Sequence, residues 1–144
     1  MEYAIENEYL IVTVTTWGAQ VKSVVRKFDD VEHMWQADKS VWGYHAPILF
    51  PHTGKVVDDL IETKGEVYQA KQHGFARLME HTLVRQTEDT IVMELRSSEE
   101  TLRIFPYAFR LVSTFTLDGD TLHHKLTVEN WDADKLYFGI GYHP

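Results

Sequence analysis

Apolar and polar residues alternate along most of the chain, and this period of two limits the fold more than any other feature. Side chains that alternate lie on opposite faces of a β-strand, whereas a helix needs an apolar residue every three or four positions. Asp118-Gly119-Asp120 is typical of a hairpin turn between two such segments. Strands are predicted over residues 9–15, 19–26, 31–35, 81–86, 91–96, 109–117, 121–130 and 135–143.

The middle of the chain breaks this alternation. Pro47 and Pro51 exclude a continuous helix or a central strand, because proline has no backbone N–H. Four features are predicted there: a structured loop over 37–51, a helical turn near 38–41, two short strands within 55–68, and a second loop over 71–80. A further short helical turn is expected to begin near Ser98.

Many short strands and almost no helix indicate an all-β protein with an antiparallel β-sandwich. No linker or internal repeat interrupts the sequence, so residues 1–144 are expected to form a single domain. The chain stops at Pro144, directly after the last predicted strand. We therefore expect either that residues 1–144 belong to a larger sandwich or that the exposed edge of this strand forms a homodimer.

Composition excludes several classes of function. The chain carries 22 acidic and 14 basic side chains and no Lys/Arg cluster, and its net charge of −8 argues against binding to nucleic acid. No apolar stretch approaches the roughly 18 residues of a membrane span. The N-terminus has neither a basic nor an apolar leader segment, so a cytoplasmic protein is expected. The absence of cysteine excludes thiolate chemistry.

Histidines are the most informative side chains for function. Those in predicted loops or beside glycine are His45, His52, His73 and His143. Their spacing matches no metal-binding motif, and no metal site is predicted. A surface or hydrogen-bonded structural role is the simpler reading of any one of them.

His143 lies at the end of the last predicted strand, on the face that carries Gly139 and Gly141. Two glycines on one face leave room for something to approach closely, which favours an open floor for a small polar ligand beside the imidazole. A β-bulge would account for the same glycines.

The loop Gln72-His73-Gly74-Phe75-Ala76-Arg77 is the sharpest local signal. Gly74 allows the backbone to turn after His73, and the side chains of His73 and Arg77 can converge as hydrogen-bond donors on one ligand. A polar surface loop would have the same composition.

Four segments together resemble the aldose 1-epimerases. They are Pro47-Ile48-Leu49-Phe50-Pro51 with Gly54, His73-Gly74-Phe75-Ala76-Arg77, Tyr107-Ala108-Phe109 after Pro106, and Gly139-Ile140-Gly141-Tyr142-His143-Pro144, in the order found in that family. The resemblance covers the whole chain and points to the galactose mutarotase-like proteins associated with lactose or galactose operons. It implies a β-sandwich longer than this chain, the galactose mutarotase-like supersandwich, with residues 1–144 as its N-terminal half.

The resemblance implies interconversion of the α and β anomers of a free aldohexose, without a cofactor. A general base removes the proton of the anomeric hydroxyl while a general acid protonates the ring oxygen, so that the ring opens and closes again on the other face. By resemblance, His143 is the acid, His73 holds or polarises the sugar hydroxyls, and Arg77 contacts the sugar or an attached phosphate. Further candidates for sugar contacts are His52 and Tyr137.

Two departures from the family pattern bear on activity. Lys55 stands where the family usually has arginine; it keeps the charge as a sugar-binding candidate but loses the two-pronged donor geometry. The general-base glutamate of the family lies in the C-terminal half, and no carboxylate in residues 1–144 matches it. We therefore expect this chain alone to be weakly active or inactive.

A non-catalytic carbohydrate-binding module is the alternative. Aromatic side chains that could stack on sugar faces are Trp17, Trp35, Trp42 and Tyr137, although packing in the core is the commoner fate of aromatics. Binding of a sugar without turnover would favour the module. Neither reading involves nucleic acid, a membrane or a metal.

Overall fold

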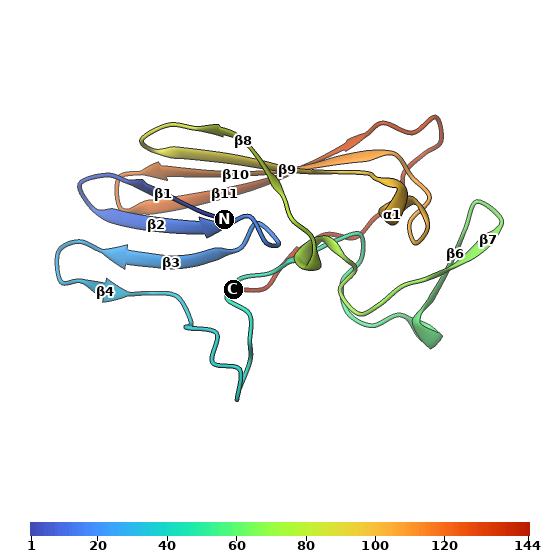
Figure 1. Ribbon diagram of the computed structural model, residues 1–144, viewed down its shortest axis with the longest axis horizontal. Coiled ribbons are helices and arrows are strands. Elements are labelled where there is room, and N and C mark those ends of the chain that lie inside the picture. Colours follow the sequence, from blue (N-terminus) through green and yellow to red (C-terminus); the bar gives the residue numbers. More distant parts are fainter.

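The computed structural model describes residues 1–144 and contains two four-stranded antiparallel sheets. The first sheet is a meander of β1 (Glu2–Glu6), β2 (Leu10–Thr15), β3 (Val21–Arg26) and β4 (Val31–Glu32). The second has the order β11-β10-β9-β8 and consists of β8 (Thr82–Gln86), β9 (Thr90–Arg96), β10 (Phe109–Asp118) and β11 (Thr121–Asn130). In Figure 1 the first sheet lies on the left, and the second runs across the upper part of the molecule. The predicted antiparallel β-sandwich is confirmed.

The core lies between these sheets. Twenty buried side chains from both sheets and from the connecting segments form one hydrophobic cluster. Ile91, Met93 and Leu95 of β9 face it, as their alternation predicts, and so do Leu111 and Phe115 of β10. The inner faces were therefore predicted correctly from the period of two.

Short elements surround the sheets. The two strands predicted within 55–68 are the hairpin β6 (Leu60–Thr63) and β7 (Glu66–Gln69), which projects at the right of Figure 1. The predicted helical turn is α1 (Glu99–Leu102), whose first turn is capped by the Ser98 side chain. Two 3₁₀ turns span Val57–Asp59 and Ala76–Leu78. No helix is long and apolar enough to cross a membrane.

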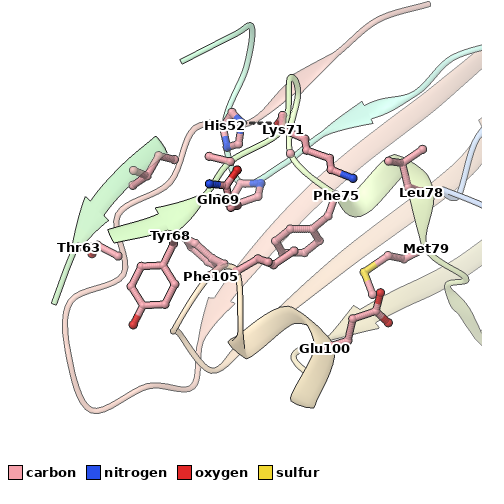
Figure 2. A pocket seen from close by; sticks show the side chains of 15 residues that line it. His52, Thr63, Tyr68, Gln69, Lys71, Phe75, Leu78, Met79, Glu100 and Phe105 are labelled. Carbon is pink, nitrogen blue, oxygen red and sulfur yellow. Dashed lines mark hydrogen bonds between the residues drawn. The ribbon is translucent and has the colours of Figure 1, made fainter. Parts of the chain in front are cut away.

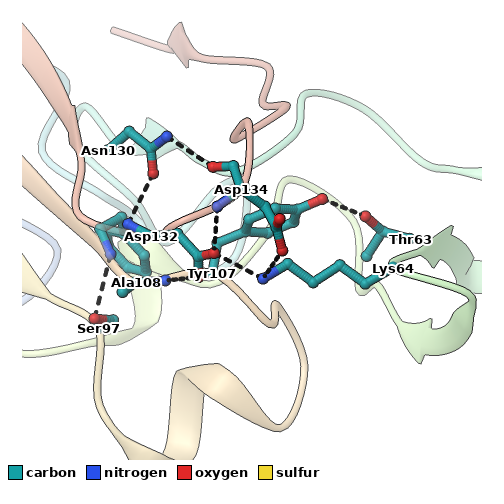
Figure 3. Close-up of polar contacts among 9 residues, drawn as sticks. Thr63, Lys64, Ser97, Tyr107, Ala108, Asn130, Asp132 and Asp134 are labelled. Atoms are coloured by element: carbon teal, nitrogen blue, oxygen red, sulfur yellow. Dashed lines mark hydrogen bonds and ion pairs between the residues drawn. The ribbon is translucent and has the colours of Figure 1, made fainter.

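Ion pairs connect the tip of the β6–β7 hairpin to the turn after β11 (Figure 3). Lys64 Nζ lies 2.8 Å from Asp132 Oδ1 and 3.1 Å from Asp134 Oδ2. Asp132 also accepts a hydrogen bond of 2.9 Å from the Ala108 backbone N–H. The Lys64 ammonium, through its hydrogen bond, holds the pKa of Asp132 well below its ordinary value. These contacts fix the hairpin against the second sheet.

The prediction of a last strand over 135–143 is wrong for most of that length. Only Gly141–Tyr142 (β12) forms a strand, and it pairs with the equally short β5 (Ile48–Leu49). The sequence analysis also does not include β1 or β5. Dimerisation through an exposed edge stays a prediction; β8 and β11 each have a neighbour on one side only.

Proline explains why β12 is short. The backbone N–H of Gly139 donates to the Pro51 carbonyl (2.7 Å), and that of His143 donates to the Pro47 carbonyl (3.1 Å). The two segments thus run side by side beyond β12, but Pro47 and Pro51 have no N–H to return. The ladder is complete only between the two prolines, and the rest of the segment is irregular.

His124 is a partly buried histidine on the inner face of β11. Its ring stacks on Phe115 with 4.2 Å between centroids and meets the Tyr142 ring edge-on at 4.9 Å. Its Nε2 atom is buried without a hydrogen-bond partner. Burial lowers the pKa of His124 to about 4, so the folded chain holds this imidazole in its neutral form.

Acid is expected to destabilise the fold through His124. The unfolded chain binds this proton near the ordinary pKa of 6.5, whereas the folded chain binds it only near 4. The folded state therefore loses about 3 kcal/mol of unfolding free energy as the pH falls through this window. Urea unfolding of His124→Phe should lack this loss, whereas His123→Phe, at the exposed neighbouring position, should keep it. An equal acid loss in wild type and His124→Phe would exclude His124 as the source.

Candidate functional site

His73 and His143, which the sequence analysis pairs in one site, lie next to each other in the structure. Their ring centroids are 6.3 Å apart, and the ring planes are inclined by 79°. A hydrogen bond of about 2.9 Å from a ring nitrogen ends roughly 4 Å from the ring centroid. Two imidazoles with centroids 6.3 Å apart are therefore close enough to contact the same oxygen or neighbouring oxygens of a small polar molecule.

The backbone of Gly54 holds His73. The His73 N–H donates to the Gly54 carbonyl (2.9 Å), and the Gly54 N–H donates to His73 Nδ1 (3.0 Å). Because Nδ1 accepts a hydrogen bond, the proton of the neutral ring lies on Nε2. His73 has a left-handed backbone with φ of 67°, an uncommon conformation that this pair of hydrogen bonds maintains.

Gly74 and Phe50 fix the loop on its other side. The N–H groups of Phe75 and Ala76 both donate to the Phe50 carbonyl, at 2.9 and 3.2 Å. A Cβ atom on Gly74 would lie only 2.1 Å from that carbonyl oxygen. Phe50 is itself fully buried in the aromatic core. The loop that carries His73 is therefore attached to the buried aromatic core, and Gly74 provides the predicted turn there.

His73 is surrounded by basic groups. Burial lowers its pKa below the ordinary value, and the charges of Arg77, His143 and His52 lower it further. No carboxylate is among the groups that act on it. At neutral pH, His73 is therefore a neutral ring whose Nε2–H is its one donor, and the Gln72 side-chain amide lies 3.3 Å from that nitrogen.

His143 is held by its backbone and by an aromatic contact. Its N–H donates to the Pro47 carbonyl, and its ring lies over Trp42 with 4.7 Å between centroids and a tilt of 34°. Both contacts come from the 37–51 loop, which the sequence analysis predicts without assigning it a role in the site.

The predicted open floor beside His143 is not present. A Cβ atom on Gly139 would lie 3.5 Å from His52 Cα, and one on Gly141 would lie 2.9 Å from Thr53 Cγ2. The glycines make room for the neighbouring His52–Thr53 segment of the chain itself. The space beside the two glycines is thus filled by the His52 backbone and the Thr53 side chain, and it is not open to a ligand.

The other four candidates differ in their surroundings. Arg77 lies with its guanidinium 4.9 Å from the Tyr44 ring centroid and donates to the Gln72 carbonyl at 3.1 Å. His52 donates from Nε2 to the Lys71 carbonyl (2.8 Å), and its buried Nδ1 has no partner. The structure therefore brings Arg77 and His52 to the surroundings of His73.

Lys55 and Tyr137 contact other residues instead of the two imidazoles. Lys55 Nζ lies 3.9 Å from Asp59 Oδ2, and two thirds of its side chain is exposed. Tyr137 is largely exposed, and its ring contacts Lys135 Nζ at 5.0 Å. Neither forms a hydrogen bond, ion pair or ring contact with His73 or His143, and their assignment to the sugar site stays a prediction.

A cavity of about 300 Å³ lies next to His52 (Figure 2). The β6–β7 hairpin and Phe105 line it, and it shares His52 and Gly74 with the surroundings of the two imidazoles. Neither His73 nor His143 lines it. No group of three or more His, Cys, Asp or Glu side chains comes together as a metal site would require.

Sequence reasoning did not identify the loop residues around the two imidazoles. The sequence suggests Trp42 only as one of several stacking aromatics and does not single out Tyr44. The available signal is the segment Trp42-Gly43-Tyr44, which places two aromatic residues around a glycine in a loop, where binding residues are often found.

Comparison with known proteins places the whole chain within one family. The family model for aldose 1-epimerase matches residues 1–144. The plasmid-encoded LacX protein of Lactococcus lactis subsp. lactis is 34% identical over an alignment that covers 100% of this chain and 50% of LacX.

Solved structures agree. A galactose mutarotase related enzyme from Lactobacillus acidophilus has a TM-score of 0.98 and 36% identity, covering 100% of this chain and 48% of that one. A galactose mutarotase-like protein from Lactobacillus casei ATCC 334 has a TM-score of 0.97 and 33% identity, covering 100% of this chain and 49% of that one. The chain spans about half the length of the relatives it matches.

Proposed function

Because the chain belongs to the aldose 1-epimerase family, we propose that it carries the acid half of a site that interconverts the α and β anomers of a free aldohexose. The observation that supports this proposal is the 6.3 Å separation of the His73 and His143 rings. Two imidazoles at this distance can address adjacent oxygens of one sugar, such as the ring oxygen and a neighbouring hydroxyl.

The two histidines have different roles in the proposed reaction. A carboxylate base takes the proton of the anomeric hydroxyl while His143 gives a proton to the ring oxygen, and the bond between the anomeric carbon and the ring oxygen breaks. The aldehyde rotates about its bond to the next carbon, and the reverse proton transfers close the ring on the other face. His73, neutral and protonated on Nε2, donates a hydrogen bond that orients the sugar without exchanging its proton.

The general base is proposed to come from outside these 144 residues. All the charged groups that act on His73 are basic, which supports a base that comes from elsewhere. The same observation favours a second candidate for this chain alone, which is sugar binding without turnover. Polarimetry with freshly dissolved α-glucose or α-galactose, with and without an added small carboxylate, distinguishes the two.

A further inference from the structure

The segment from Trp35 to His45, which we call the aromatic loop, leaves the first sheet after β4 and returns toward β5. The Trp35 indole Nε1–H donates to the Trp42 carbonyl (2.8 Å), and His45 Nδ1 lies 2.8 Å from the Trp35 carbonyl. The Trp42 N–H also donates to the Asp38 carbonyl (2.8 Å). These hydrogen bonds connect residues within the aromatic loop, so the loop has a defined conformation.

Two aromatic side chains of this loop contact the proposed sugar site. Trp42 lies over the His143 ring at 4.7 Å, and Tyr44 lies under the Arg77 guanidinium at 4.9 Å. The Trp42 and Tyr44 rings are themselves 5.9 Å apart. The aromatic loop therefore contacts both His143, the proposed acid, and the loop that carries His73.

Arg77 connects Tyr44 to the backbone next to His73. Its guanidinium donates to the carbonyl of Gln72, the residue directly before His73, while the planar group stacks on Tyr44. The side chain thus connects the aromatic loop to the backbone that sets the direction of the His73 ring. In this arrangement the guanidinium is already engaged with protein groups.

We propose that the aromatic loop is the positioning element of the two imidazoles: Trp42 fixes the ring of His143, and Tyr44 fixes the His73 loop through Arg77. This inference rests on the proposed function for its catalytic consequence, whereas the contacts themselves can be tested without activity. Trp42 and Tyr44 are positioning residues, because each acts through another side chain.

The Trp42–His143 contact is tested by intrinsic fluorescence. An imidazole in contact with an indole alters its emission, so His143→Asn should change the emission of the chain at a fixed neutral pH. The same substitution should have no effect in a Trp42→Phe background, and it should keep its effect in a Trp131→Phe background, whose missing indole contacts Arg96 instead. No change on His143→Asn, or an equal change in the Trp42→Phe background, would overturn the contact whatever the catalytic result.

The positioning role is tested in the carboxylate-supported mutarotation assay described in the Discussion. Trp42→Leu and Tyr44→Leu are expected to lower kcat by about 10- to 100-fold, because displacement of a reacting group by about 1 Å has effects of that size. Trp42→Phe and Tyr44→Phe keep an aromatic face and should retain most of the rate. Equal loss in the Leu and Phe variants, or no loss in either, would contradict the proposal. If the wild-type chain shows no mutarotation at all, the proposed function fails while the fluorescence result stands on its own.

Discussion

Gly74→Ala is expected to lower the free energy of unfolding by about 3 kcal/mol, which combines backbone strain with a steric clash. The Cβ atom would lie 2.1 Å from the Phe50 carbonyl oxygen and 2.7 Å from the Pro51 nitrogen, and neither backbone atom can move without shifting the core. Gly74 also has a φ of 70°, which alanine rarely adopts. A thermal melt should show a midpoint lower by roughly 10 °C.

Gly119→Ala is the matched control for this prediction. Gly119 also has a positive φ, of 56°, but a Cβ atom there meets nothing within 4 Å. Its substitution should cost only the conformational strain, about 1 kcal/mol. Equal losses in the two variants would show that the contact with Phe50 contributes nothing to the position of the His73 loop.

An added small carboxylate is expected to give the chain a mutarotase activity that depends on His143. Without it, the rotation of freshly dissolved α-galactose should decay at the spontaneous rate, because the proposed site has an acid but no base. Acetate or formate is small enough to approach a sugar bound at the exposed His143 and to remove its anomeric proton. The protein-dependent rate should then rise with carboxylate concentration, and His143→Ala should reduce it by about 100-fold or more, the usual contribution of a general acid.

The controls separate this rate from buffer catalysis. The rate with carboxylate alone is subtracted, and sodium sulfate at the same ionic strength replaces the carboxylate in a parallel series. Strong acceleration by the chain without any carboxylate would show that the base lies within residues 1–144. Rescue of the same size in wild type and His143→Ala would contradict the role of His143. Sugar binding with no rescue would favour the carbohydrate-binding module.

The alternating segments allowed most of the sandwich to be predicted from the sequence. In β9 and β10 every second side chain is buried, so the period of two identifies both the strand and its inner face. The segment 135–143 alternates equally well but is mostly irregular, because its neighbour contains Pro47 and Pro51. Alternation indicates which side chains are buried. It does not indicate whether the neighbouring segment has the backbone N–H groups that a β-ladder needs.

The candidate site, too, is predictable from the sequence only in part. The resemblance pairs His73 and His143 although they are far apart in the sequence, and their ring centroids lie 6.3 Å apart in the structure. The glycines beside His143 were misinterpreted as an open floor, because a missing side chain can make room for the protein itself as well as for a ligand. The contacts of Trp42 and Tyr44 depend on how a loop without regular period folds back, which local sequence does not reveal.

The central claim is that His73 and His143 form one sugar site, and NMR of the histidine ring protons tests it most directly. Titration with galactose should shift the His73 and His143 signals along curves that give a single dissociation constant, while the exposed His123 does not respond. Galactitol, which has no anomeric carbon and no ring oxygen, should shift both signals far less. Shifts at only one of the two histidines, or different dissociation constants for them, would contradict the account.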